Sequence, residues 1–288
     1  MQTLSQSKYL RAALGNERGR GRRIALVPTM GNLHEGHLQL VRHAHDIADI
    51  VVVSLFVNPM QFGADEDFDT YPRTISEDQQ KLEAENTHFL YMPDLAEMYP
   101  NGVEAHTAIT VPALDGILCG ASRPIFFTGV CTVVCKLLNL VAPDVAIFGE
   151  KDFQQLTIIQ RMVSDLCMPI EIVGVATARA HDGLALSSRN NYLTTVERAR
   201  APQLYQLLQT IRDNILAGEK NYTQLCADAR QVLERAGFEV DYVEVRRQAD
   251  LMLAQDDVEE HKLVVLAAAM LGTTRLIDNI SITQKRLS

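Results

Sequence analysis

Short apolar runs alternate with helix-like segments between residues 24 and 176. Runs rich in aliphatic and β-branched residues predict buried strands at 24–27, 50–57, 88–92, 145–148 and 170–176. The segments between them carry apolar residues at helical spacing or are polar and helical in character. They predict helices at 36–48, 76–86, 129–141 and from about 150 to 163. Strands that alternate with helices predict an α/β fold, with a Rossmann-like parallel sheet and helices on both of its faces.

The pattern changes near residue 176. A polar, turn-rich stretch is followed by two helical segments, 195–216 and 222–236, and then by candidate strands at 240–245, 262–268 and 274–280. We therefore expect two domains: a Rossmann-like domain, 1–176, and a smaller α+β C-terminal domain, 177–288.

Composition narrows the class of protein. The chain has 288 residues, of which 47% are hydrophobic and 22% charged, as in ordinary globular proteins. It has neither an apolar run of bilayer length nor a secretory pattern at its start, so we expect a cytoplasmic protein that does not bind membranes. The net charge of -9 disfavours a general role on nucleic acid, whose phosphates recruit basic faces.

Three polar loops, 28–37, 58–63 and 149–152, follow predicted strands. Because the carboxyl ends of parallel strands share one edge of a sheet, these loops should line a ligand crevice. In the first loop, His34 and His37 are three residues apart at the start of a helix, where free backbone N–H groups and the helix dipole attract phosphate. The alternative is a capping turn with two surface histidines. Their spacing does not fit a zinc-binding H-E-x-x-H helix.

The stretch Pro28-Thr29-Met30-Gly31-Asn32-Leu33-His34-Glu35-Gly36-His37 resembles the H-x-G-H nucleotidylyltransferase superfamily, and in its extended form the pantothenate synthetase (pantoate–β-alanine ligase) family. Further stretches are similar to that family, in order along nearly the whole chain: 56–62, 71–74, 148–156, 182–190, 241–246 and 275–279. The resemblance implies an ATP-dependent ligase. Pantoate would attack the α-phosphorus of ATP to give pantoyl adenylate and pyrophosphate, and β-alanine would then give pantothenate and AMP.

The resemblance also implies roles for individual residues. His37, His34 and Lys151 would be catalytic, Gln61 and Gln155 would bind pantoate, and Gln61 would also contact β-alanine. The residues implied to bind ATP are Met30, Gly31, Asn32, Leu33, His34, Glu35, Gly36, His37, Gly149, Glu150, Lys151, Asp152, Ala178, Leu186, Ser187, Ser188 and Arg189. The second domain would close over ATP. Taken in isolation, Gln61, the 150–152 cluster and the 187–190 loop would each be ordinary surface or loop residues.

Mg²⁺ is expected together with ATP, held largely by phosphates and water. Its protein ligands are not identified: the acidic run 65–67 and Asp69 are candidates, but a solvated acidic loop is the favoured interpretation. The family resemblance further implies a homodimer, to which residues 109–111 or 113–120 could contribute.

The chain departs from the family pattern at Arg123-Pro124-Ile125-Phe126-Phe127-Thr128. The family usually has glycine where this chain has Ile125, and histidine where it has Phe126. A position with positive φ would accept isoleucine only with strain, so we expect a flap that is reshaped, more apolar or less able to contact phosphate, and assign Arg123 no role. Two other functions remain open: adenylylation of a phosphorylated acceptor, and nucleotide binding without turnover.

Overall fold

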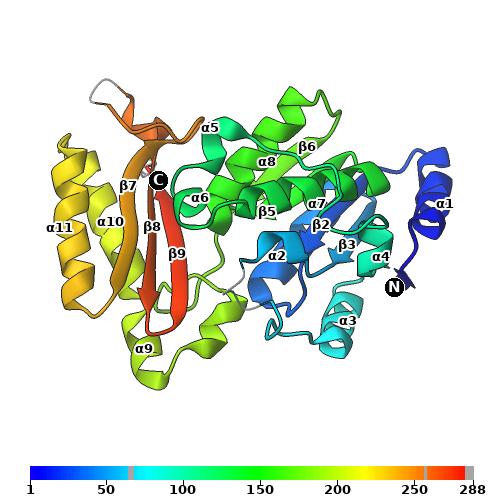
Figure 1. Cartoon of the computed structure of the whole chain (residues 1–288), viewed down its shortest axis with the longest axis horizontal. Coiled ribbons are helices and arrows are strands. Elements are labelled where there is room, and N and C mark those ends of the chain that lie inside the picture. The colour runs from blue at the N-terminus through cyan, green and yellow to red at the C-terminus, as the bar shows by residue number, and fades with distance from the viewer. Residues whose placement is uncertain (64–67, 256–257, 283–288) are drawn as a thin grey trace. The chain divides into compact units, whose positions relative to one another are not determined.

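The structure is a computed structural model that describes residues 1–63, 68–255 and 258–282. The chain divides into two compact units, and Figure 1 shows the elements of each. The first unit comprises Met1–Glu150 and Ile158–Ala176, and the second comprises Lys151–Thr157 and Thr177–Ser288.

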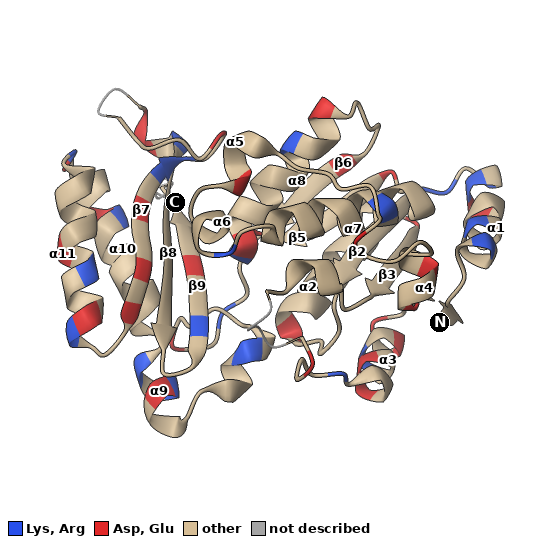
Figure 2. Ribbon diagram, in the orientation of Figure 1, with Lys and Arg blue, Asp and Glu red and all other residues tan. Residues whose placement is uncertain are grey.

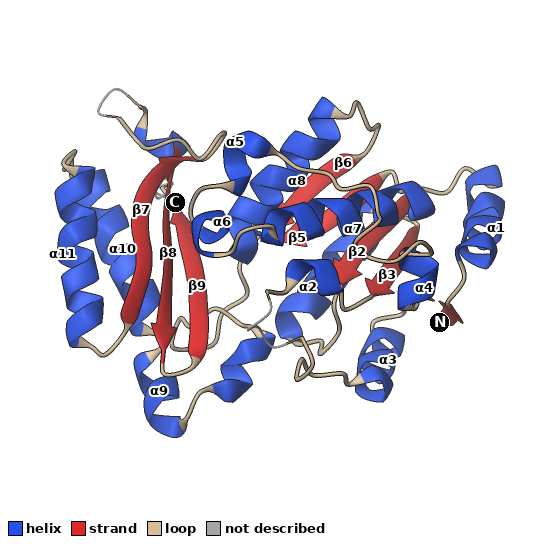
Figure 3. Cartoon of the chain, viewed as in Figure 1, coloured by secondary structure: helices blue, strands red, loops and turns tan. Residues whose placement is uncertain are grey.

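The first unit is built on a parallel sheet whose six strands, among the described residues, have the order β1-β4-β3-β2-β5-β6. Figure 3 labels β3, β2, β5 and β6 of this sheet. The strands are β1 (Gln2–Leu4), β2 (Ile24–Thr29), β3 (Ile50–Leu55), β4 (Phe89–Tyr91), β5 (Val145–Gly149) and β6 (Glu171–Val175). The predicted α/β class and five of the strands are confirmed. The short edge strand β1 was not predicted, since three residues are too few to show a pattern.

Alternate residues of the central strands face opposite sides of the sheet. Ala25 and Val27 of β2 share a core cluster with Leu40 and Ala44 of helix α2 (Glu35–Ile47). The intervening residues of β2 point to the other face. Helix α7 (Phe126–Val141) contacts β2 and also α1 (Ser7–Gly19), and its buried residues lie outside the α2 cluster. Helices therefore cover both faces, as predicted.

The chain order of the strands reverses at β2. From β2 the chain passes to β3 and β4 on one side, whereas β5 and β6 lie on the other side. β2 pairs with β3 along its whole length but with β5 at Ala25 and Leu26. The two neighbours β2 and β5 thus stop pairing before their carboxyl ends, which is where open α/β sheets bind ligands. The residues that follow these ends are 30–37 and 150.

The remaining helices of the first unit connect these strands. They are α3 (Ile75–Ala84), α4 (Leu95–Met98), α5 (Pro112–Asp115), α6 (Cys119–Ser122) and the 3-10 turn η1 (Pro59–Gln61). Helix α8 (Phe153–Asp165) begins in residues of the second unit and continues in the first. The short helices α4, α5 and α6, and helix α1, were not predicted. No described helix is long and apolar enough to cross a membrane.

The second unit has an antiparallel sheet of order β7-β8-β9, formed by β7 (Glu239–Arg247), β8 (Leu263–Leu271) and β9 (Thr274–Ser281). Helices α10 (Gln203–Leu216) and α11 (Tyr222–Arg235) share its core cluster. The segment 195–216 was predicted as one helix and is two, because α9 (Thr195–Arg200) ends before Ala201 and Pro202. Proline lacks the N–H that a continuous helix would need there. Acidic and basic residues are interspersed along α11 (Figure 2).

Residues 151–157 belong to the second unit, although we assigned them to the first domain from the sequence. The side chain of Asn279 in β9 donates from Nδ2 to the Lys151 carbonyl at 2.9 Å. This bond joins Lys151, in the turn η2 (Glu150–Asp152), to the C-terminal sheet. The two residues are far apart in the sequence, so no local pattern predicts their contact.

Candidate functional site

The turn that follows β2 has two residues with positive φ, Gly31 at 89° and Asn32 at 50°. His34 is the N-cap of α2. Its Nδ1 accepts from the Gly36 N–H at 3.1 Å, and the His34 N–H donates to His37 Nδ1 at 3.3 Å. The ring centroids of the two histidines are 4.1 Å apart. The turn between β2 and α2 is therefore stabilised by hydrogen bonds among its own residues.

These capping bonds determine what the two imidazoles can offer a ligand. A ring nitrogen that accepts from a backbone N–H carries no proton, so in the neutral ring the other nitrogen, Nε2, does. His34 and His37 each have an accepting Nδ1 and hence an Nε2–H donor. The sequence left a choice between a capping turn and a phosphate site. The histidines do cap the helix, and the same bonds orient one Nε2–H group on each ring beside a helix N-terminus, an arrangement that suits phosphate oxygens.

Asp78 of α3 is fully buried and stabilises this turn by hydrogen bonds to its backbone. Its carboxylate accepts from the N–H groups of Asn32 and Leu33, both at 2.8 Å. Lys81, one helical turn further along α3, donates to the Leu33 carbonyl at 2.8 Å. A Cβ on Gly31 would lie 3.2 Å from Asp78 Oδ2. Sequence reasoning missed Asp78 because it is one acid among many in the polar helix 76–86.

Gln61 lies in η1, which follows β3 after a short loop, and is 9% exposed. Its Nε2 lies 2.9 Å from the sulfur of Met30, and its Oε1 accepts from Asn58 Nδ2 at 3.2 Å. The structure thus brings the loops 28–37 and 58–63 together, as expected of neighbouring strands at one sheet edge. Asn58 and Tyr99, whose hydroxyl donates to Asn58 at 2.8 Å, were not identified from the sequence.

Helix α7 packs directly against the backbone of η1. A Cβ on Gly129 would lie 2.2 Å from the Met60 carbonyl oxygen and 2.8 Å from the Gln61 nitrogen, so only glycine fits there. Asn58 Nδ2 also donates to the Gly129 carbonyl at 3.1 Å. The close packing of α7 against η1 therefore fixes the position of the Gln61 backbone.

The divergent flap, 123–128, leads into α7 and includes the first residues of that helix. Ile125 is the N-cap of α7, with φ 66° and a 73% exposed residue surface. The Arg123 guanidinium lies 3.6 Å from the centroid of the Phe126 ring and donates to the Gln61 carbonyl at 3.3 Å. At Ile125 the backbone adopts the left-handed conformation that favours glycine, and isoleucine bears the resulting strain.

The second unit holds Lys151, Asp152 and Gln155. Lys151 Nζ lies 3.9 Å from the Asp152 carboxylate, and the Lys151 side chain is 19% exposed. Gln155 lies half-buried in the first turn of α8. Its neighbour Gln154 is buried.

The loop that carries the remaining predicted ATP contacts is a compact hairpin. The Leu186 N–H donates to the Ala178 carbonyl at 2.9 Å, and the Ala180 N–H to Leu184 at 2.8 Å. Ser187 then caps the 3-10 helix η3 (Ser188–Tyr192), since its Oγ accepts from the Arg189 N–H at 3.3 Å. Predicted residues 178 and 186–189 therefore share one ordered loop.

Arg179 anchors this loop to β9 and was not assigned a role from the sequence. Its guanidinium donates to both carboxylate oxygens of Asp278, at 2.6 and 2.9 Å, and lies 3.5 Å from the centroid of the Tyr205 ring. Burial raises the pKa of Asp278, and the neighbouring Arg179 opposes that rise. Removing one partner of such a buried pair would leave the other uncompensated. The pair thus fixes the loop within its own unit.

No group of three or more His, Cys, Asp or Glu side chains that could hold a metal occurs among the described residues. The candidate acidic run 65–67 lies outside them. Mg²⁺ bound with ATP needs few protein ligands, because phosphate oxygens and water complete its octahedral shell.

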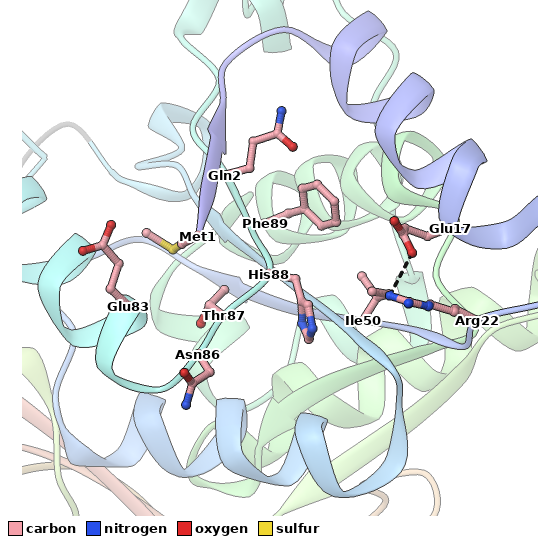
Figure 4. Close-up of a pocket in the computed structure, with 10 residues that line it drawn as sticks. All are labelled: Met1, Gln2, Glu17, Arg22, Ile50, Glu83, Asn86, Thr87, His88 and Phe89. Carbon is pink, nitrogen blue, oxygen red and sulfur yellow. Dashed lines mark ion pairs between the residues drawn. The ribbon is translucent and has the colours of Figure 1, made fainter. Parts of the chain in front are cut away.

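One cavity, of about 380 Å³, lies at the other edge of the sheet, near the amino ends of β1, β3 and β4 (Figure 4). His88 lines it, together with the ion pair of Glu17 and Arg22, whose atoms are 3.1 Å apart. None of the predicted site residues lines this cavity.

Comparisons with known proteins agree with the resemblance over the whole chain. The family model described as pantoate-beta-alanine ligase matches residues 2–281. The chain is 54% identical over 280 residues to the pantothenate synthetase of Pseudomonas entomophila, covering 97% of each chain. Among solved structures, it is similar to pantothenate synthetase from Thermus thermophilus, with a TM-score of 0.91, 41% identity, and coverage of 98% and 99%.

A second solved structure adds ligands. It is a pantoate-beta-alanine ligase from Francisella tularensis complexed with beta-gamma ATP and beta-alanine, with a TM-score of 0.81, 30% identity and 98% coverage of both chains. A match of this extent, in sequence and in fold, shows that the chain belongs to the pantoate-beta-alanine ligase family.

Proposed function

We propose that this chain joins pantoate to β-alanine in two steps, through a pantoyl-adenylate intermediate. A pantoate carboxylate oxygen attacks the α-phosphorus of ATP, and the bond from that phosphorus to the bridging oxygen breaks, releasing pyrophosphate. The β-alanine amine, after losing a proton, then attacks the acyl carbon, and its nitrogen loses a second proton as the amide forms. The acyl–oxygen bond to AMP breaks, and AMP leaves with that bond's electron pair.

The observation that carries the proposal is the pair of Nε2–H donors at the N-terminus of α2 with a neutral amide beside them. Capping bonds hold His34 and His37 with their ring centroids 4.1 Å apart, and Gln61 contacts Met30 of the same turn. The first step brings two anions together and develops negative charge on the leaving pyrophosphate. N–H donors fixed before the reaction meet that demand without reorganisation, and His37 is our candidate for the proton donor or stabiliser.

Gln61 and Gln155 are our candidates for binding pantoate, and Gln61 also for contacting β-alanine. An amide can donate to a carboxylate and accept from a hydroxyl or an ammonium group. A buried neutral amide favours an acceptor that is a small carboxylic acid over a phosphorylated one, which arginines would recognise better. The Francisella tularensis relative was solved with beta-gamma ATP and beta-alanine, which supports ATP and β-alanine as substrates of this chain.

Lys151, Asp152, Ser187, Ser188 and Arg189 are proposed to contact ATP from the second unit, which would close over the nucleotide. The lysine ammonium and the arginine guanidinium suit phosphate oxygens, and the serine hydroxyls can donate to them. Mg²⁺, the homodimer and a cytoplasmic location remain predictions from the family resemblance and the composition.

One assay tests the proposed function. The protein is incubated with ATP, Mg²⁺, pantoate and β-alanine, each acid is omitted in turn, and AMP and pyrophosphate are measured. We expect pyrophosphate to require pantoate and sustained AMP release to require both acids. Pyrophosphate formation without pantoate would indicate another acceptor. Absence of turnover would indicate a nucleotide-binding protein without this activity.

A further inference from the structure

Tyr99 donates a hydrogen bond into the loop that holds Gln61. It directly follows α4, is 3% exposed, and its hydroxyl lies 2.8 Å from Asn58 Oδ1. The phenol is protonated at neutral pH and acts as a donor, and burial, which raises the pKa of Tyr99 to about 12, favours that form further. Asn58 itself is 1% exposed, so the bond is formed away from water.

The Asn58 amide has a defined orientation. Its Nδ2 donates to the Gly129 carbonyl at 3.1 Å, and its Oδ1 accepts from the Met60 N–H at 3.3 Å. A carbonyl can only accept and a backbone N–H can only donate, so turning the amide over would break both bonds. The Tyr99 hydroxyl adds the shortest of the bonds to Oδ1 and so stabilises this orientation.

The orientation of Asn58 determines that of Gln61. Asn58 Nδ2 meets Gln61 Oε1 at 3.2 Å, so the Gln61 oxygen acts as an acceptor within the protein. The Gln61 nitrogen then lies toward Met30, at 2.9 Å from its sulfur, and carries the hydrogens that a ligand can use. A flipped Gln61 would present its oxygen there and repel a carboxylate.

We propose that Tyr99 is a positioning residue for pantoate: through Asn58 it keeps the Gln61 amide turned so that its N–H groups meet the substrate carboxylate. The inference rests on the proposed role of Gln61 in binding pantoate. Tyr99 has no part in binding ATP phosphates, which face the donors of the α2 N-terminus. Its loss should therefore affect one substrate selectively.

The chain contains a matched control for this hydrogen bond. Tyr91 in β4 is also buried, at 0% exposure, and burial raises its pKa to about 12 as well. Its hydroxyl has no hydrogen-bond partner among the described residues. Tyr91→Phe and Tyr99→Phe thus remove the same atom from two buried rings, but only Tyr99→Phe removes a bond to Asn58.

Steady-state kinetics of the two variants test the proposal. We expect Tyr99→Phe to raise KM for pantoate about tenfold, as for the loss of one well-placed hydrogen bond, and to leave KM for ATP within about twofold of the unmodified chain. Tyr91→Phe should leave both constants unchanged. Equal constants for Tyr99→Phe and Tyr91→Phe would overturn the proposal, and so would an equal rise in KM for pantoate and ATP.

A double-mutant cycle then tests whether Tyr99 acts through Gln61. If it does, Tyr99→Phe raises KM for pantoate in the full chain but has no further effect in a Gln61→Ala background. Additive effects would indicate a general structural role and overturn the proposal. Failure of the unmodified chain to form pyrophosphate from ATP and pantoate would overturn the proposed function itself, and with it this inference. If the unmodified chain turns over normally and Tyr99→Phe has the same KM for pantoate, the inference about Tyr99 is overturned but the proposed function is not.

Discussion

The carboxylate of Asp78 accepts the backbone N–H of Leu33 at 2.8 Å, across 45 residues of sequence. Its other oxygen accepts the N–H of Asn32 at the same distance. Between the end of β2 and the start of α2 the backbone turns away from the sheet, so the N–H groups of Asn32 and Leu33 do not pair with a neighbouring strand. A buried carboxylate satisfies both of them at once. The shape of the turn therefore depends on α3 as much as on its own glycines.

Replacing Asp78 with alanine should destabilise the chain by about 3 kcal/mol, because two buried N–H groups lose their acceptor. It should also raise KM for ATP, since the turn that presents His34 and His37 loses its support. Asp78→Asn keeps one accepting oxygen and should have an intermediate effect. Denaturant unfolding and steady-state kinetics measure the two quantities.

Asp165 offers the control for Asp78. It pairs with Arg161 at 2.8 Å on the surface of α8, where both side chains are more than half exposed. Exposed pairs of this kind contribute about 0–1 kcal/mol, so Asp165→Ala should be nearly silent. A similar loss of stability in both variants would contradict the role given to Asp78.

Ile125 is expected to be a site where glycine stabilises the chain. An L-residue in the left-handed region costs about 1–2 kcal/mol relative to glycine, more than the roughly 0.5–1 kcal/mol of extra chain entropy that glycine loses on folding. Because Ile125 is 73% exposed, few apolar contacts are lost. We therefore expect Ile125→Gly to raise the free energy of unfolding by about 0.5–1 kcal/mol. Urea denaturation measures this change.

Val232 provides the opposite case. It is also exposed, at 51%, but it lies inside helix α11. Val232→Gly should destabilise the chain by roughly 0.5 kcal/mol, because glycine is a poor helix former. If both substitutions destabilise, the strain that we assign to Ile125 is absent.

Local pattern was enough to predict five of the six strands that the described residues form in the sheet of the first unit. Strands such as 24–27 and 145–148 are continuous apolar runs, which is what burial on both faces requires. Helix α1 escaped prediction because its mean hydropathy is low and it buries few residues, Leu10 and Leu14 among them. The break at Pro202 was visible in the sequence but was read as part of a longer helix.

The supporting residues of the site could not be predicted in the same way. Asp78, Tyr99 and Asp278 act through bonds to residues 41 to 99 positions away. Nothing in their own neighbourhoods distinguishes them from surface acids or core aromatics. The histidines were found because their loop follows a predicted strand, where topology brings side chains to one edge of the sheet, whereas the role of Gln61 came from the family resemblance.

His88 makes stability depend on pH. Its Nδ1 accepts from the Val51 N–H at 3.1 Å, and burial, followed by the nearby His45 and Arg22, lowers its pKa below 6.5, with Glu17 opposing them. As the pH falls through about 6.5, His88 is therefore protonated in the unfolded chain while it is still neutral in the folded chain. The contribution of His88 is fully present above that pH and is lost as the pH falls below it.

His88→Gln should therefore flatten the pH dependence of unfolding. We expect the unmodified chain to lose more stability than the variant between about pH 7.5 and about pH 5.5, measured by urea denaturation at each pH. Glutamine can still accept from the Val51 N–H but has no proton to gain. An equal decline in both proteins would mean that His88 does not titrate differently in the folded and unfolded states.

His37 is expected to matter for the chemical step more than for folding. His37→Ala removes an N–H donor aimed at phosphate and the acceptor of the His34 N–H. The lost capping bond should cost about 1 kcal/mol, whereas a donor that stabilises developing charge contributes about a hundredfold or more in rate. The variant should thus fold but form pyrophosphate slowly in a single turnover with ATP and pantoate. His43→Ala, on the same helix α2, is the control, because that residue takes no part in the turn. Near-normal single-turnover rates for His37→Ala would leave His37 as a cap alone and would move the proton donor or charge-stabilising role to His34 or Lys151.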